Sequence, residues 1–119
     1  MKYRSGLERT FHQKFAACSY EKNKLEYIVK HTYTPDFCLA PNMYVETKGR
    51  FTGADRNKHL AVRQQNPKVK VLFVFQNPKL TLSKKSKTTY ADWCDKNGFK
   101  WLSINEVGAY SHQQLIDLL

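Results

Sequence analysis

Two acidic residues and one lysine lie close together in the sequence, in an order that can bind a divalent cation. Asp36 follows a proline, and Glu46 and Lys48 come ten and twelve positions after it. Carboxylate oxygens are the ligands that Mg²⁺ prefers, and a bound Mg²⁺ can polarise a phosphoryl oxygen and activate water. An ammonium group beside the carboxylates can orient that water for attack. The residue types therefore indicate hydrolysis of a phosphate ester.

The elements expected around these residues would bring them together. A turn is expected over residues 40–42, since proline and asparagine favour turns. It would join a strand over His31–Phe37 to a return strand over Met43–Lys48. Side chains alternate along a strand, so Glu46 and Lys48 would share one face. This is the PD-(D/E)xK pattern of metal-dependent nucleases, although surface hairpins with solvated charges have the same residue types.

Four segments, in the same order and at close spacing, resemble one family of phage endonucleases. They are Arg4–Glu8, His31–Phe37, Val45–Gly49 and Asp55–Leu60. Together they are similar to the junction-resolving endonuclease I family of bacteriophage T-seven and its relatives, and the resemblance runs from about Tyr3 to about Trp101. It implies an α/β fold of the restriction-endonuclease-like (PD-(D/E)xK) type, with a mixed sheet flanked by helices.

The resemblance also implies a role for each candidate residue. Asp36 and Glu46 would hold a first Mg²⁺, which Mn²⁺ can replace, and Glu8 would complete that site or hold a second metal. Lys48 would orient the nucleophilic water and balance charge. The backbone carbonyl of Thr47 could add a metal ligand, because the segment is extended there. The expected reaction hydrolyses phosphodiester bonds of DNA and leaves a 5′ phosphate.

A first helix is expected over about Gly6–Cys18, where apolar residues recur at helical spacing. Ser5 and Glu8 match a capping box, in which the glutamate returns a hydrogen bond to the cap. Glu8 therefore has two candidate roles, helix cap and metal ligand. The family resemblance favours the metal ligand.

The resemblance further implies a homodimer in which two chains exchange their first helices. Glu8 of one chain would then act with Asp36, Glu46 and Lys48 of its partner. An extended segment over Tyr20–Lys30, with a break near Asn23, would carry the helix across. This bridge is shorter than expected for the junction resolvase, so a monomer and a swapped dimer both stay open.

The remaining pattern predicts alternating helices and strands. A second helix opens at residues 52–55 and ends before Asn66-Pro67, and a third runs from Thr88 or Thr89 to Asn97. A buried strand over Val69–Phe75 and a strand over Phe99–Leu102 complete a mixed sheet. We expect one nuclease domain over residues 1–119, with a catalytic core over 1–102. The tail, 103–119, is expected to form a short amphipathic helix that packs on the domain or on a partner.

Positive charge dominates the chain, with a formal net charge of +10. This favours a polyanion such as DNA, although an acidic protein partner could use the same charge. The second helix is expected to present a mostly solvated basic face that includes His59 and Arg63. The polar loop over Gln76–Lys87 is either a solvated linker or a clamp on the DNA backbone. The candidate DNA-binding residues are Arg4, Arg56, Lys58, Lys84, Lys85 and Lys87.

Composition and further resemblances narrow the classes of protein to which this sequence could belong. The sequence contains no run of about 18 apolar residues, so a soluble, intracellular protein without a membrane contact is expected, in the host cytoplasm if it is phage-encoded. The favoured function is nicking or cutting of duplex DNA, because residues 74–77 and 87–101 look like homing-type relatives of the resolvase. The alternatives are a structure-selective Holliday-junction resolvase and a non-catalytic basic DNA-binding protein.

Overall fold

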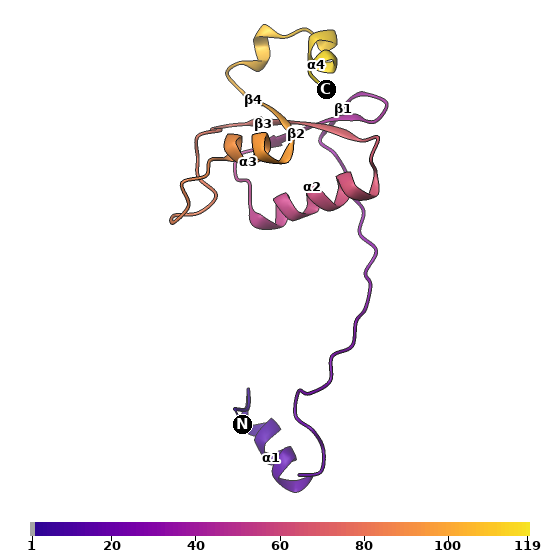
Figure 1. Ribbon diagram of the computed structural model, residues 1–119, viewed down its shortest axis with the longest axis vertical. Coiled ribbons are helices and arrows are strands. Elements are labelled where there is room, and N and C mark those ends of the chain that lie inside the picture. The colour runs from indigo at the N-terminus through magenta and orange to yellow at the C-terminus, as the bar shows by residue number, and fades with distance from the viewer. Residues whose placement is uncertain (1) are drawn as a thin grey trace. The chain divides into compact units, whose positions relative to one another are not determined.

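A computed structural model describes residues 2–119 of the chain. The chain divides into two compact units, Met1–His31 and Thr32–Leu119 (Figure 1). The larger unit holds the whole sheet. The expected single nuclease domain stays a prediction. Among the described residues, no helix is both long enough and apolar enough to cross a membrane.

The N-terminal unit contains one short helix, α1, over Gly6–Lys14. It ends before the expected Cys18, because the chain turns back there: the amide of Cys18 donates to the carbonyl of Phe15 at 3.0 Å. Residues 22–31 have no regular structure, in keeping with the expected extended segment. Glu21, two residues before Asn23, has a φ of 46°, close to the expected break.

The larger unit is built on a four-stranded mixed sheet in the order β1-β2-β3-β4. β1 and β2 are antiparallel, whereas β2 pairs with β3, and β3 with β4, in parallel. The strands are β1 Phe37–Ala40, β2 Met43–Lys48, β3 Lys70–Phe75 and β4 Lys100–Ser103. This open mixed sheet confirms the expected α/β class.

Helices cover both faces of the sheet (Figure 1). α2 (Gly53–Gln65) and α3 (Tyr90–Asn97) lie against one face, and α4 (His112–Leu118) lies against the other, preceded by the 3₁₀ turn η1 (Val107–Ala109). α2, α3 and α4 each begin with a capping box, so their start points follow from the sequence. α3 ends at Gly98, whose φ of 73° suits glycine.

The buried strand β3 supplies side chains to both layers of the core. Val71, Phe73 and Phe75 join the cluster beneath α2 and α3, together with Phe51, Tyr90, Cys94 and Phe99. Leu72 and Val74 join the opposite cluster, against which the tail packs Val107, Tyr110, Leu115, Leu118 and Leu119. The expected amphipathic tail helix therefore covers the sheet of its own chain.

The expected strand over His31–Phe37 is wrong, because β1 begins only at Phe37. Pro35 has no amide hydrogen to give to a ladder. The amide of Asp36 donates to the side chain of Glu46 instead of to a backbone carbonyl. Residues 31–36 therefore approach the sheet without joining it. β4 also starts one residue later than expected, because the amide of Phe99 donates to the carbonyl of Cys94 at the end of α3.

Candidate active site

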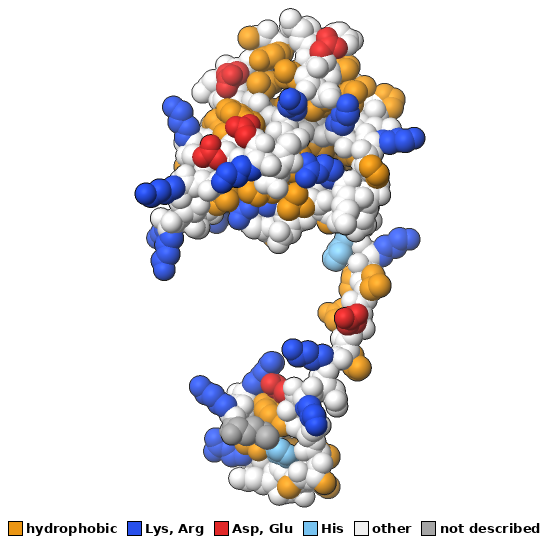
Figure 2. All heavy atoms as spheres, viewed as in Figure 1, with side chains coloured by type: hydrophobic (Ala, Val, Ile, Leu, Met, Phe, Trp, Pro, Cys, Tyr) orange, Lys and Arg blue, Asp and Glu red, His pale blue; other side chains and the backbone are white. Residues whose placement is uncertain are grey.

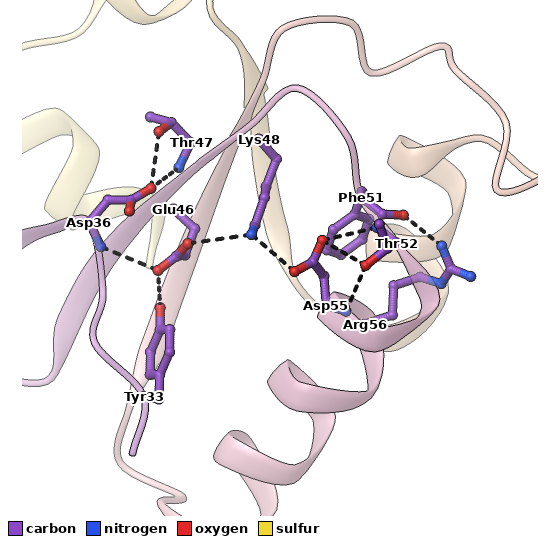
Figure 3. A network of polar contacts seen from close by, with 9 residues as sticks. All are labelled: Tyr33, Asp36, Glu46, Thr47, Lys48, Phe51, Thr52, Asp55 and Arg56. Carbon is purple, nitrogen blue, oxygen red and sulfur yellow. Dashed lines mark hydrogen bonds and ion pairs between the residues drawn. The ribbon is translucent and has the colours of Figure 1, made fainter. Parts of the chain in front are cut away.

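The β1–β2 hairpin brings Asp36 and Glu46 side by side. Phe37 pairs with Val45, so the next position outward sets Asp36 opposite Glu46. The amide of Asp36 donates to Oε1 of Glu46 at 3.3 Å. Figure 3 shows the resulting row of polar contacts, which runs from Asp36 through Glu46 and Lys48 to Asp55.

Each of the two acids is held through one carboxylate oxygen. Oδ2 of Asp36 accepts hydrogen bonds from the amide of Thr47 at 2.9 Å and from its hydroxyl at 3.0 Å. The hydrogen bond from the Thr47 amide is the main reason why the pKa of Asp36 lies below its usual value. On Glu46, Oε1 accepts from the hydroxyl of Tyr33 at 2.5 Å as well as from the Asp36 amide. Asp36 is exposed, whereas Glu46 is only 3% exposed.

Lys48 lies between two carboxylates on the same face of β2 as Glu46. Its Nζ is 4.0 Å from Oε2 of Glu46 and 3.2 Å from Oδ1 of Asp55. Asp55 also caps α2, since its Oδ2 accepts from the amide of Thr52 at 3.0 Å. Burial would raise the pKa of Asp55, but the hydrogen bonds from Thr52 and Lys48 lower it overall. The first turn of α2 therefore anchors the ammonium group of Lys48.

Two aromatic residues behind the acids were missed as site residues by the sequence pattern. Tyr33 is half-buried, and its ring packs edge-on against His59 with centroids 5.1 Å apart. Burial, and then the hydrogen bond to Glu46, raise the pKa of Tyr33. His59 is 1% exposed, which corrects the expectation that it belongs to a solvated face. The spacing of Tyr33 three residues before Asp36 was visible in the sequence, but its contact with Glu46 was not.

The acids have a donor set that suits a hard divalent cation. Within the described residues, Oδ1 of Asp36 receives no hydrogen bond, and Oε2 of Glu46 faces only the Lys48 ammonium. No group of three or more His, Cys, Asp and Glu in residues 2–119 is arranged to hold a metal ion. Mg²⁺ needs no such group, since it commonly binds one or two carboxylates together with water and substrate phosphate. The residues present therefore fit Mg²⁺.

The backbone of Thr47 is directed toward the same acids. The N–H and C=O of one strand residue point to the same neighbouring strand. The N–H of Thr47 donates to Asp36, so its carbonyl points to that side as well. The carbonyl of Lys48 faces β3 instead, where it accepts from Gln76. This geometry suits the expected ligand role of the Thr47 carbonyl.

Glu8 belongs to the N-terminal unit, so the cluster of Asp36, Glu46 and Lys48 is formed without it. Its amide donates to the hydroxyl of Ser5 at 3.2 Å, which is one arm of the expected capping box. Its carboxylate, however, accepts a hydrogen bond from the hydroxyl of Tyr20. The carboxylate thus contacts Tyr20, a residue that the capping interpretation does not use.

The candidate DNA-binding residues have different surroundings. Arg4 forms an exposed ion pair with Glu21 at 2.8 Å, and Arg56 donates to the carbonyl of Phe51 at 2.7 Å. Lys58 lies over the ring of Tyr33, 5.5 Å from its centroid. Exposed cations follow one another on the loop between β3 and α3, at Lys84, Lys85 and Lys87. Figure 2 shows Lys and Arg side chains projecting from this end of the larger unit.

Arg63 is not part of a solvated basic face. Its guanidinium lies 4.3 Å from the ring centroid of Phe99 and donates to the carbonyl of Asn97. The side chain therefore ties α2 to the end of α3. Of the cations expected on this face, Lys58 is exposed.

The fold and the site together define a class of protein. An open mixed sheet flanked by helices is consistent with a restriction-endonuclease-like fold, and the acids and lysine on its β1–β2 hairpin form a candidate hydrolytic centre. Residues 1–105 match the family described as phage endonuclease I. The chain belongs to this phage endonuclease I family.

Two curated relatives support the assignment. Endonuclease I of Escherichia phage T7 is 40% identical over 106 residues, which cover 83% of this chain and 71% of that protein. Endodeoxyribonuclease 1 of Enterobacteria phage T3 is 38% identical over 103 residues, which cover 81% of this chain and 68% of that protein. The family match ends at residue 105, so it includes the whole sheet but leaves out α4.

Proposed function

We propose that this chain is a Mg²⁺-dependent DNA endonuclease that hydrolyses phosphodiester bonds and leaves 5′-phosphate ends. The observation that carries the proposal is the contiguous cluster of Asp36, Glu46 and Lys48, in which each acid is held through one oxygen. Family membership and the names of the two relatives point to the same class of reaction. Mn²⁺ should replace Mg²⁺, because it accepts the same oxygen ligands.

The residues have distinct roles in the proposed reaction. Asp36 and Glu46 would hold the metal, with the Thr47 carbonyl as a further ligand and Glu8 completing the site or holding a second metal. The bound cation would supply charge stabilisation at the scissile phosphate and a more acidic water. Lys48 would orient the nucleophilic water. Its ammonium is kept in place by Asp55, so it does not have to be ordered when the substrate arrives.

A plasmid-nicking assay tests this proposal. Asp36→Asn, Glu46→Gln and Lys48→Ala should each abolish nicking in Mg²⁺ or Mn²⁺ while DNA affinity stays within about tenfold, because most phosphate contacts lie elsewhere. Asp117→Asn and Lys96→Ala, which change an exposed acid and an exposed lysine outside the cluster, should cut at the parent rate. Nicking by Lys48→Ala at near the parent rate would show that the site is misassigned. Nicking by the parent without any divalent cation would refute the metal dependence.

The substrate is proposed to be duplex DNA, which the protein nicks or cuts. The net charge of +10 and the exposed lysines at positions 84, 85 and 87 favour binding to the phosphate backbone. A structure-selective resolvase is the second candidate, since the same backbone contacts serve a branched substrate. Cleavage of a four-way junction and of linear arms with matched sequence separates the two. Preference for the junction by a factor of about ten or more would overturn the duplex assignment.

A swapped homodimer is proposed because the N-terminal unit leaves its apolar side chains in solvent. Leu7 is 80% exposed, Leu25 92% and Ile28 98%, whereas a stable soluble protein rarely exposes so many large apolar side chains close together. A second copy of the chain would cover them and would bring Glu8 of one chain to Asp36, Glu46 and Lys48 of the other.

Co-expression of two inactive chains tests the exchange. Glu8→Ala chains and Glu46→Ala chains should form mixed dimers while they fold. In a swapped mixed dimer one site carries both lesions and the other carries neither, so nicking of one strand should return. In a protein without exchange, every site keeps one lesion, and the mixture should be as inactive as either variant. No recovery, together with a monomeric mass in solution, would refute the swapped dimer.

A further inference from the structure

The hydroxyl of Tyr33 makes the shortest hydrogen bond recorded at the site. It donates to Oε1 of Glu46 at 2.5 Å, whereas the Asp36 amide donates to the same oxygen at 3.3 Å. Tyr33 belongs to the irregular segment before β1, so no ladder of the sheet fixes its position. Its ring is fixed by side chains instead. His59 packs edge-on against it, and the ammonium of Lys58 lies over it.

Glu46 needs such a donor because its carboxylate is buried. A charged carboxylate that is 3% exposed requires hydrogen bonds or ion pairs to replace the water it has lost. Oε2 has the Lys48 ammonium, but only at 4.0 Å. Oε1 is therefore the oxygen through which the side chain is held, and Oε2 is the oxygen directed toward Lys48.

We propose that Tyr33 is a positioning residue of the active site, which holds Oε1 of Glu46 so that Oε2 is presented to the metal and to Lys48. This inference rests on the proposed metal-dependent function of the same site. Tyr33 contacts neither the substrate nor the metal in this arrangement. Partners that orient metal-binding carboxylates commonly contribute tenfold to hundredfold to metal affinity or activity, which sets the scale of the expected effect.

Substitution by phenylalanine removes only the hydroxyl. The ring of Tyr33→Phe keeps its contacts with His59 and Lys58, so the fold should persist. Tyr110→Phe is the matched control, because Tyr110 packs on the opposite face of the sheet and its hydroxyl makes no hydrogen bond within the described residues. Both variants should melt within a few degrees of the parent.

Calorimetric titration with Mn²⁺ measures the effect without turnover. We expect Tyr33→Phe to bind Mn²⁺ about tenfold to hundredfold more weakly than the parent, and Tyr110→Phe to bind it equally well. In nicking assays the Mn²⁺ concentration that gives half the maximal rate should rise by a similar factor, while the rate at saturating Mn²⁺ should fall less. Incorporation of 4-aminophenylalanine at position 33, which returns an N–H donor to the same place, should recover most of the affinity.

The outcomes separate this inference from the proposed function. Equal Mn²⁺ affinity of the parent and Tyr33→Phe, where Glu46→Gln binds weakly, would overturn the role of Tyr33 and leave the metal site intact. A loss in Tyr33→Phe that the amino analogue does not recover would also overturn it, since the loss would then not depend on a hydrogen-bond donor at this position. A parent that binds no Mn²⁺ and nicks no DNA would overturn the proposed function, and the role of Tyr33 with it.

Discussion

Replacing His59 with phenylalanine should raise the free energy of unfolding. The imidazole is 1% exposed, and neither of its nitrogens has a hydrogen-bond partner within the described residues. A buried polar atom without a partner costs about 1–3 kcal/mol, which phenylalanine avoids. The new ring would still pack against Phe73 and Tyr33, whose centroids lie 4.7 Å and 5.1 Å from the imidazole. The slightly larger ring introduces some strain, so we expect the free energy of unfolding to rise by a net amount of about 1–2 kcal/mol at pH 7.

Acid should widen the gap between the parent and the His59→Phe variant. Burial, and then the charges of Lys58 and Lys48, lower the pKa of His59 from 6.5 to about 4, against a small opposing effect of Asp55. The unfolded chain therefore binds more protons than the folded protein between these two pKa values. The parent then loses stability as the pH falls through that window, by about 2 kcal/mol between pH 7 and pH 4.5. The variant has no such group.

Urea unfolding followed by circular dichroism, at several pH values and without metal, measures both effects. Carboxylates protonate in parent and variant alike, so the difference between the two proteins isolates His59. His31→Gln, a change at an exposed histidine, is the matched control. A parent–variant difference that is the same at pH 7 and pH 4.5 would refute the buried, neutral state of His59. A variant that is less stable than the parent at pH 7 would contradict the expected gain in the free energy of unfolding.

Three further changes test the surroundings of the site. Asp55→Asn keeps a cap for Thr52 but removes the charge beside Lys48, so nicking should fall about tenfold, or about 1.4 kcal/mol. Asp92→Asn, at the matching position of the α3 capping box, should nick at the parent rate. If Asp55→Asn and Asp92→Asn nick at the same rate, Asp55 has no role in catalysis. Neutralising Lys84, Lys85 and Lys87 together should lower the slope of log affinity against log salt by up to about three phosphate contacts, and an unchanged slope would mean that the loop is only a linker. Ca²⁺ should permit DNA binding with little cleavage, because its looser coordination positions water poorly, and rapid nicking in Ca²⁺ would contradict this.

Sequence patterns predicted the parts of the fold that depend on local interactions. The bounds of β2 were predicted correctly, because a turn precedes it and its side chains alternate. α2 and α3 begin at threonines whose partners three residues later complete capping boxes. β3 was recognisable as a buried strand, since it is apolar on both faces. These features need only neighbouring residues, so a single sequence contains them.

The parts that sequence patterns missed depend on packing between elements. The helical pattern of α2 put His59 on a basic face, but the helix lies on the sheet with that side chain against Phe73. Lys48 was expected near Glu46, yet its nearer carboxylate belongs to Asp55, across the turn into α2. No spacing rule links a strand lysine to the third residue of the next helix. The start of β1 was expected too early, because Pro35 has no amide hydrogen and the amide of Asp36 donates to the side chain of Glu46.

The two glutamates of the predicted metal site differ in whether local sequence or assembly determines their position. Glu46 sits in a hairpin whose register sets its distance to Asp36, and its hydroxyl donor, Tyr33, lies on the segment that enters that hairpin. The whole cluster therefore derives from one contiguous stretch, residues 33–59, so a short motif contains the residues that form it. Glu8 also accepts a hydrogen bond from a tyrosine, Tyr20, but within the N-terminal unit. Its place in catalysis depends on how two chains assemble rather than on hairpin register, so the mixed-dimer experiment, and not the motif, must decide it.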